Sequence, residues 1–337
     1  MLGSCGLPFP ESIMSTTPEV FVADKKLGFI CAFTAATLMG FVGFFARHIN
    51  AQGDFIAWSR MACGAILFFG ILAYKGRLGD LKTYKISPSM VMSGFFMGNC
   101  LSAYIASTQL TSIANAVFFI YVGPIISTLL AIVFLRETLK LATVIAVVAV
   151  FIGMMAISGF INYGPEGLSV GIQFAQETFL GDMLGLYSGV GYGLFLFFGR
   201  YRTEVPGDVR AFWNFVFAVA GITILFTFTQ PTISQMTASD WMWWVGIGFV
   251  CGFGALGTCT IATRHLKAVE FACVSYWECV VAAVFIGYLF YGETMNAMQL
   301  FGGALIIFGG MSEMLLALLK GAAKKSQAKK AAPTAAA

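Results

Sequence analysis

Charged residues are scarce in this chain. Asp, Glu, Lys and Arg together make up 11% of its 337 residues, whereas hydrophobic residues reach 58%. A soluble globular protein carries about 25% charged residues. A soluble domain of this length could not hide so much apolar surface behind so few charges, which excludes that class. The abundance of Phe (34), Gly (38) and Met (16) instead favours a chain whose solvent is lipid.

Motifs for catalysis or metal binding are also missing. Of the eight cysteines, all but Cys5 lie in apolar runs, and none forms a CxxC pair, so we expect packing residues rather than ligands. His48 and His265 flank the expected membrane region on opposite sides and cannot share one metal. The sequence contains no P-loop, HExxH or GxSxG motif. We therefore predict a protein that is not an enzyme or an ATP-driven pump and that needs no cofactor.

Long apolar runs fill most of the chain. A membrane-spanning helix needs about 20 mostly apolar residues, and ten stretches meet this requirement. We therefore predict an all-α membrane protein with ten transmembrane helices in contact with the lipid bilayer. The predicted spans are 27–46, 55–74, 88–108, 112–135, 139–161, 180–199, 209–229, 240–262, 268–290 and 296–319.

The basic residues lie almost entirely on one side of this arrangement. With a cytoplasmic N-terminus, the cytoplasmic loops and ends hold all but two of the 20 Lys and Arg residues. The exceptions are Arg47, on the opposite side, and Arg60, inside the second span. By the positive-inside rule we expect both termini in the cytoplasm and a multi-pass chain in the plasma membrane, or the inner membrane of a Gram-negative bacterium. The net charge of +4 then reflects topology, and we expect no nucleic-acid partner.

The longest break between spans divides the chain into two halves. It covers 162–179 and contains the sequence Gly-Pro-Glu-Gly. The predicted organisation, in chain order, is a cytoplasmic segment 1–26, a first repeat 27–161, an extracytoplasmic linker 162–179, a second repeat 180–319 and a basic disordered tail 320–337. The first twenty residues lack the pattern of a signal peptide, and Met14 is an alternative start to Met1.

The two halves are related in sequence. Residues 110–137 align without a gap to residues 266–293, which pairs Tyr121 with Trp277. Each half has five predicted helices, an odd number, so the second half must enter the membrane from the opposite side. Two inverted five-helix repeats are typical of secondary carriers, in which a site near the middle of the membrane is exposed to each side in turn.

Several local sequences match a known pattern. The first half has Arg60 early in its second span, Pro124 in its fourth span and the sequence FLRETL at 134–139. The second half has YLFYGE at 288–293, and its last span is rich in glycine. Each half thereby resembles the EamA-type domain of the drug/metabolite transporter superfamily. The resemblance implies a ten-helix carrier with a central cavity lined by both halves, commonly an exporter of amino acids or related metabolites.

One position departs from the pattern of that family. The family's ninth helix often carries a Glu-Pro pair fourteen and thirteen residues before its terminal Glu. Those positions are Cys279 and Val280 here, and the acid, Glu278, comes one residue earlier. One residue on an α-helix rotates a side chain by about 100°. A regular α-helix would therefore point Glu278 away from the direction of the family's acid.

Two ionisable residues inside the predicted spans are candidates for the site. Glu278 lies near the centre of the ninth span, where it could exchange a proton or bind a cationic group of a substrate. A neutral Glu hydrogen-bonded to a neighbouring helix is the structural alternative. Arg60 could bind a substrate carboxylate, pair with Glu278 or reach helix-end carbonyls. It could also extend to the membrane interface in a purely structural role.

Aromatic and amide side chains complete the predicted site. Tyr121 and Trp277 both lie mid-helix, and two aromatics that face one cavity would suit a ring, an apolar side chain or an ammonium group. Packing or contact with lipid is an equal alternative for them. The remaining candidates are Phe118, Tyr276, Asn99, Asn115 and Asn214, the last being the repeat counterpart of Arg60. Glu137 and Glu293 lie at helix ends, where we expect them to cap or orient the next helix.

The leading hypothesis is an exporter of a small amino-acid-like metabolite, either passive or coupled to protons. A carrier of phosphorylated or nucleotide-linked sugars is the alternative within transport. Such ligands need cationic partners, and the interiors of the third, fourth, eighth and ninth spans contain no Lys or Arg. A membrane-embedded enzyme or a non-transporting sensor would need an acid/base pair, a metal cluster or an extramembrane domain, and the sequence indicates none of them.

Overall fold

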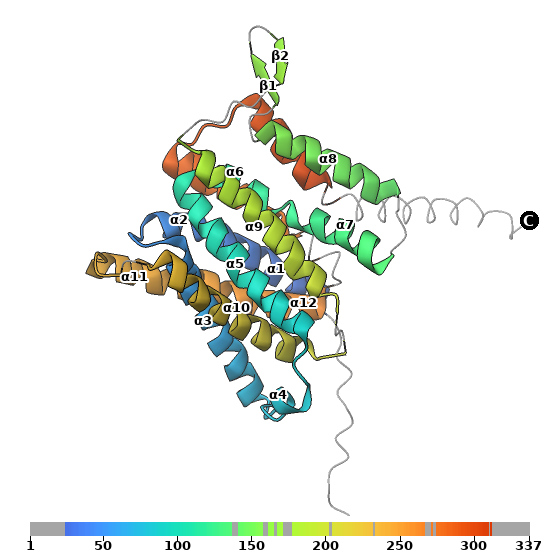
Figure 1. The fold of residues 1–337 in the computed structure, drawn as a ribbon, viewed down its shortest axis with the longest axis vertical. Coiled ribbons are helices and arrows are strands. Elements are labelled where there is room, and N and C mark those ends of the chain that lie inside the picture. Colours follow the sequence, from blue (N-terminus) through green and yellow to red (C-terminus); the bar gives the residue numbers. More distant parts are fainter. Residues whose placement is uncertain are drawn as a thin grey trace, which may run out of the picture.

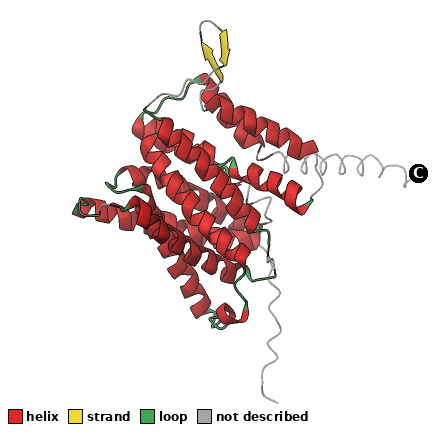
Figure 2. Cartoon of the chain, in the orientation of Figure 1, coloured by secondary structure: helices red, strands yellow, loops and turns green. Residues whose placement is uncertain are grey.

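The structure is a computed structural model. It describes residues 24–136, 141–157, 161–164, 167–170, 177–201, 204–231, 233–266, 271, 274–309 and 311. Helices make up almost all of the regular structure in these ranges, as Figures 1 and 2 show. The predicted segment 1–26 and tail 320–337 lie largely or wholly outside the described residues.

The helices of the first half follow the predicted spans. In chain order they are α1 (Lys25–Gly40), α2 (Val42–Arg47), α3 (Gly53–Tyr74), α4 (Asp80–Thr83), α5 (Pro88–Leu110), α6 (Ile113–Ile120), α7 (Gly123–Leu135) and α8 (Leu141–Ile157). The short helix α4 lies in the loop between the second and third predicted spans.

The second half begins after a β-hairpin and contains two π-helical stretches. Its elements are α9 (Phe179–Phe198), α10 (Gly207–Thr229), α11 (Ala238–Ile247), the π-helix η1 (Gly248–Gly254), α12 (Ala255–His265), α14 (Trp277–Val280) and the π-helix η2 (Val281–Phe290). A last helix covers Ala297–Gly309.

A short β-hairpin lies at the linker between the two helical halves. Strands β1 (Ile161–Gly164) and β2 (Gly167–Val170) pair antiparallel, with Ile161 opposite Val170. Gly167 has a φ of 99°, which glycine adopts without strain, and this lets the linker turn back on itself. The membrane-crossing part of the described chain is all-helical, as predicted, and these two strands are the only extended elements among the described residues.

Local sequence signals explain where several helices begin. The side chain of Asp24 accepts hydrogen bonds from the backbone N–H groups of residues 26 and 27 at the start of α1. Ser112 caps α6 by accepting from Asn115 N. Thr237 and Asp240 form a reciprocal capping box at the start of α11. Each cap satisfies backbone donors that a helix leaves unpaired at its first turn.

A break divides the fourth predicted span into α6 and α7. Pro124 has no N–H and its ring would clash with the carbonyl of residue 120 in a continuous helix. The helix accordingly ends at Ile120 and resumes at Gly123. Tyr121 therefore lies at the interruption, in the middle of the span, where its side chain is not confined to a regular helical face.

Within the described residues, seven helical runs are long and apolar enough to cross a membrane. They are Lys25–Arg47, Gly53–Tyr74, Pro88–Leu110, Ile113–Leu135, Phe179–Phe198, Gly207–Thr229 and Ala238–Thr263. Shorter apolar helices cover Val147–Ile157, Trp277–Phe290 and Ala297–Gly309. Large apolar side chains face outward on these helices, such as Phe228 and Met242, which are 81% and 72% exposed. Extensive apolar exposure of this kind marks a surface that contacts lipid, and the chain is a multi-pass membrane protein.

Helices from the two halves are packed against each other. Helix α5 packs on α9 and α10, α3 packs on α10, and α1 packs on α12; Figure 1 shows α5, α6 and α9 side by side. Small residues allow the close approach, because a Cβ placed at Gly98 of α5 would lie 2.6 Å from the carbonyl oxygen of Ala218 in α10. The site described below lies between these helices.

Candidate substrate-binding site

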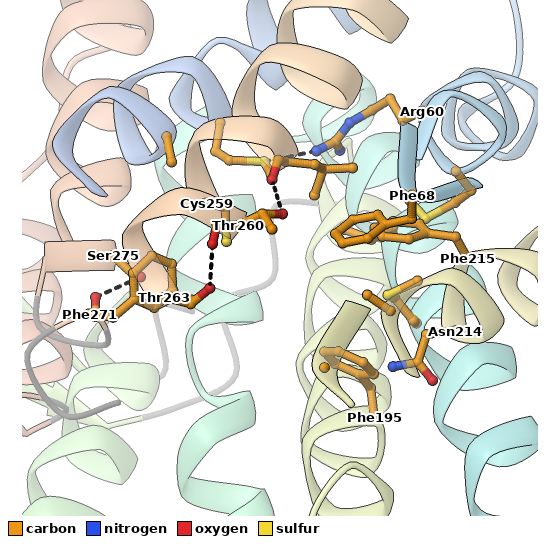
Figure 3. A pocket seen from close by; sticks show the side chains of 18 of the residues that line it. Arg60, Phe68, Phe195, Asn214, Phe215, Cys259, Thr260, Thr263, Phe271 and Ser275 are labelled. Atoms are coloured by element: carbon orange, nitrogen blue, oxygen red, sulfur yellow. Dashed lines mark hydrogen bonds between the residues drawn. The ribbon is translucent and has the colours of Figure 1, made fainter. Parts of the chain in front are cut away.

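A cavity of about 820 Å³ lies between the halves of the chain. Arg60, Tyr104, Tyr121 and Glu278 line it in the middle of the helices. From there it extends to Lys75, in the loop that follows α3, at one end of the helices. Figure 3 shows part of its wall, with side chains converging from several helices. A cavity that runs from mid-helix to one end is accessible from one side of the membrane.

Most of the wall between these polar groups is apolar. The rings of Phe68 in α3 and Phe215 in α10 stack with their centroids 5.6 Å apart (Figure 3). Met39, Met61 and Met97 also line the cavity. Methionine side chains are flexible and adapt to ligands of different shape. The wall therefore suits the apolar body of a small molecule.

Glu278 and Tyr121 are joined by a hydrogen bond. Tyr121 Oη lies 2.8 Å from Glu278 Oε2 and 2.8 Å from the carbonyl oxygen of Ser275. A single O–H group donates fully to one acceptor at a time. When Glu278 is ionised, Tyr121 can donate to it; when Glu278 is protonated, it can donate to Tyr121 while Tyr121 donates to Ser275. The arrangement thus accommodates both protonation states of the carboxyl group.

Arg60 is buried in the wall of the cavity, with 2% of its surface exposed. Its Nη2 lies 3.0 Å from the sulfur of Met39. Among the described residues it forms no ion pair, with Glu278 or with any other acid. The sequence had left a pairing with Glu278 and an extension to the membrane interface open, and the structure shows neither. Within the described part of the chain, Nε and Nη1 of Arg60 are buried without a hydrogen-bond partner.

Basic and acidic residues surround the end of the cavity. Lys75 Nζ lies 2.8 Å from Asp208 Oδ2, and Arg77 Nη1 lies 2.9 Å from the same oxygen. Arg77 Nη2 also pairs with Asp80 Oδ2 at 2.7 Å. These ion pairs tie the loop after α3 to the first turn of α10. They partly neutralise the basic charge at this end.

Three of the predicted aromatic residues lie outside the cavity wall. Trp277 Nε1 donates to Thr37 Oγ1 at 3.0 Å, which directs the ring toward α1. Phe118 is buried against Gly303 of the last helix. Tyr276 is buried with its ring centroid 5.0 Å from that of Tyr121. Of the two alternatives left open by the sequence, Trp277 follows the packing one, because its indole N–H finds its partner on a neighbouring helix.

The predicted amides are dispersed. Asn214 lines the cavity. Asn99 lines a second cavity, of about 790 Å³, and its Nδ2 donates to the carbonyl of Phe95 at 2.9 Å. Asn115 Nδ2 donates to Asp182 Oδ1 at 3.2 Å, and Asn115 Oδ1 accepts from Gln299 at 3.3 Å. Asn115 therefore connects helices, and of the nine predicted site residues the cavity brings together Arg60, Tyr121, Asn214 and Glu278.

Two tyrosines in the wall were not predicted. Tyr104 of α5 and Tyr192 of α9 both line the cavity, and Tyr104 is almost completely buried. A phenolic O–H in the middle of an apolar span is a signal that could have found Tyr104, because buried hydroxyls need partners. Tyr192 lies in a glycine-rich stretch, and no feature of its surroundings in the sequence distinguishes it.

Glu293 stabilises a helix other than the one expected. Its Oε2 accepts a hydrogen bond from Ile113 N, the first residue of α6, at 3.0 Å. The prediction placed it as a cap for the helix that follows it, whereas the partner helix belongs to the other half. Its repeat counterpart, Glu137, lies outside the described residues.

The π-helix η2 explains the position of Glu278. It lies between Glu278 and Glu293, and its i→i+5 hydrogen bonds make a wider turn than those of an α-helix. A wider turn holds an additional residue. We therefore interpret η2 as the reason why Glu278, although one residue earlier than the family's acid, still faces the cavity. Glu278 accordingly lines the cavity, whereas Cys279 is fully buried.

Apolar helices that cross the membrane several times, around a cavity lined by both halves, define a membrane carrier. The family model for the EamA-like transporter family matches residues 26–159 and again residues 179–311. The chain therefore belongs to the EamA-like transporter family, within the drug/metabolite transporter superfamily. Its match to two successive segments shows that the domain is duplicated.

Individual proteins agree with this assignment. The chain is 25% identical to an uncharacterized transporter of Archaeoglobus fulgidus over 279 residues, which cover 82% of this chain and 92% of that protein. It is 28% identical over 150 residues to the uncharacterized transporter YxxF of Bacillus subtilis, covering 43% and 47% of the two chains. A crystal structure shares the fold with a TM-score of 0.58 at 17% identity, covering 87% of this chain and 98% of the other. The family and both named relatives are described as transporters.

Proposed function

We propose that the protein exports small amphipathic metabolites, such as amino acids or related compounds, by alternating access. The observation that carries this proposal is the presence of Arg60 and Glu278, of opposite charge, in the wall of one otherwise apolar cavity. An amino acid carries a carboxylate, an ammonium group and a side chain. The cavity offers a partner of suitable chemistry for each of them.

We propose further that ten helices cross the membrane as two inverted repeats. The pairing of helices supports this arrangement. If the halves are equivalent, the third span (α5) corresponds to the eighth (α12), and the sixth (α9) corresponds to the first (α1). The structure packs α5 against α9 and, correspondingly, α12 against α1. The same equivalence turns the pair α7 and α9 into η2 and α1, which are again in contact. A two-fold axis in the membrane plane accounts for this correspondence.

The direction of transport is proposed from the end to which the cavity extends. Lys75, Arg77 and Arg210 line that end. Basic residues favour the cytoplasmic side, so this conformation would receive substrate from the cytoplasm of the cell. We place the protein in the plasma membrane with both termini cytoplasmic. We also propose protons as the coupling ion, because the carboxyl group of Glu278 can be hydrogen-bonded in either protonation state.

Flux into proteoliposomes tests the proposed function. Purified protein is reconstituted and screened with radiolabelled amino acids and, in parallel, glucose 6-phosphate. We expect saturable flux of at least one amino acid and none of the sugar phosphate. Protein-free vesicles and a double variant, Arg60→Gln with Glu278→Gln, are the controls. Flux of the phosphate alone would support the alternative carrier, and absence of flux for every amino acid would refute the proposal.

A further inference from the structure

Buried polar atoms without hydrogen-bond partners are concentrated in the cavity. Within the described part of the chain six buried side-chain atoms have no partner, and four of them belong to residues that line the cavity. These four atoms are Arg60 Nε, Arg60 Nη1, Tyr104 Oη and Asn214 Oδ1. Most buried polar atoms of folded proteins are hydrogen-bonded. A cluster of exceptions in one cavity indicates a place where a ligand supplies the missing partners.

Three of these four atoms favour an anion, whereas Asn214 Oδ1 is an acceptor and needs a donor group on the ligand. Arg60 Nε and Nη1 are both donors, and Tyr104 Oη can donate as well. Among the described residues, the one hydrogen bond of the Arg60 guanidinium is from Nη2 to the sulfur of Met39, which is a weak acceptor. A positive charge is costly in the middle of a membrane unless it is paired. An oxyanion at one edge of the guanidinium group can accept from an unpaired N–H group of Arg60 and from Tyr104, and it supplies the opposite charge.

We propose that Arg60, assisted by Tyr104, binds the carboxylate group of the transported molecule. The substrate class is therefore carboxylates with a single negative group and an apolar body, amino acids among them. The inference rests on the proposed function and deepens it, because it assigns the group that every substrate must carry. A substrate then does not need an ammonium group in order to bind, although Glu278 can bind that group where the substrate has one.

A phosphate monoester fits the same cavity poorly. Such a group is close to doubly charged at neutral pH and needs more than one cation. In the middle of the described helices the cavity wall contains one cation, Arg60, and one acid, Glu278, that repels a dianion. Lys75 and Arg77 lie at the open end and are already paired with Asp208. The arrangement therefore favours a carboxylate.

A matched series of probes tests the proposal by equilibrium binding to the purified full-length protein. The probes are leucine, leucine amide, 4-methylpentanoate and 3-methylbutyl phosphate, which share a similar branched apolar body. Leucine amide keeps the ammonium group without the carboxylate, and 4-methylpentanoate keeps the carboxylate without the ammonium group. We expect leucine and 4-methylpentanoate to bind at least about tenfold more tightly than the amide and the phosphate.

Variants connect this preference to Arg60. Loss of one partner from a buried charge pair lowers affinity strongly, so we expect Arg60→Gln to weaken binding of 4-methylpentanoate by at least about 30-fold. Arg60→Lys keeps the charge but loses the planar fork, and it should restore part of the affinity. Lys82→Gln removes the same charge from an exposed position on α4 and should leave the affinity unchanged. Tyr104→Phe removes one donor and should have a smaller effect, which provides a second test if Arg60→Gln does not fold.

Binding and transport results separate the two proposals. Equal affinity for leucine and its amide, tighter binding of the phosphate, or no saturable binding of any carboxylate would overturn the inference. So would an Arg60→Gln variant that keeps the thermal stability and the carboxylate affinity of the original protein. Binding of carboxylates through Arg60 without flux in proteoliposomes would leave the inference standing and refute the proposed transport function.

Discussion

Arg47 and Glu293 form an ion pair at the end of the helices opposite to Lys75, with Nη2 and Oε1 2.6 Å apart. Arg47 also donates to the carbonyl oxygens of Thr108 and Thr111, each at 2.8 Å. Glu293 accepts in addition from the first N–H group of α6. The pair thus connects α2, the end of α5, the start of α6 and the loop after η2. It holds both halves together where the main cavity is closed.

The first prediction follows from this pair. Replacing Glu293 with Gln keeps the shape of the side chain and removes its charge, so the conformation closed at this end should become less populated. Both side chains are partly exposed, at 21% and 15%, and we expect a loss of about 1.5 kcal/mol at most, equivalent to a tenfold change in the equilibrium.

Labelling of Cys259 measures this change. Cys259 lines the cavity, and in a variant that keeps it as the sole cysteine an impermeant maleimide should react from the cytoplasmic side. We expect Glu293→Gln to slow this reaction in inside-out vesicles. Lys82→Gln, distant from the pair, serves as the control. An unchanged or faster rate for Glu293→Gln would show that the pair does not stabilise closure at its end.

The second prediction concerns close packing of α5 on α10. Gly98→Ala would place a Cβ 2.6 Å from the carbonyl oxygen of Ala218, and backbone atoms on both sides would have to separate. We expect a cost of about 1–3 kcal/mol and a lower melting temperature in detergent. Gly70→Ala is the matched control, because nothing lies within 4 Å of its added Cβ and alanine is the better helix former. Equal melting temperatures for the two variants would contradict the packing described here.

The third prediction concerns topology. A cysteine introduced at residue 82, in α4, should be protected from an impermeant reagent in intact cells, since the loop after α3 is proposed to be cytoplasmic. A cysteine at residue 234, between α10 and α11, should react. Permeabilised cells provide the control, in which both positions should be labelled. Reaction of residue 82 in intact cells would reverse the proposed orientation.

The parts of the fold that depend on composition were predictable. Apolar length alone locates the helices, because hydrocarbon thickness sets the number of residues a span needs. The break after Ile120 follows from Pro124, and Arg60 and Glu278 stand out because ionisable groups are rare in apolar spans. Each of these features depends on one residue or on one continuous apolar segment, so a single sequence is sufficient to predict it.

The direction of a side chain was less predictable. Trp277 and Glu278 are adjacent in the sequence, yet Glu278 lines the cavity and Trp277 points to Thr37 of α1. One residue corresponds to about 100° of rotation, so a local change of helical geometry such as η2 decides which residue faces the site. Hydrogen bonds between helices distant in the sequence, such as that of Glu293 with α6, likewise depend on tertiary contacts that periodicity does not reveal.

The last prediction concerns the carboxyl group of Glu278. Glu278→Gln keeps the volume of the side chain and can still accept a hydrogen bond from Tyr121, so the variant should fold and insert normally. It has no proton to exchange. If protons drive transport through this carboxyl group, flux in proteoliposomes should lose its response to an imposed pH gradient, while exchange of substrate at equal pH continues.

Tyr121→Phe provides the matched comparison for that experiment. It removes the hydroxyl that pairs with Glu278 in either protonation state and leaves the carboxyl group in place. We expect flux that still responds to the pH gradient, with a pH dependence displaced from that of the original protein, because the carboxyl group keeps its proton chemistry but loses one partner. A Glu278→Gln variant with the original flux and the original response to the gradient would show that Glu278 serves only to hold helices together.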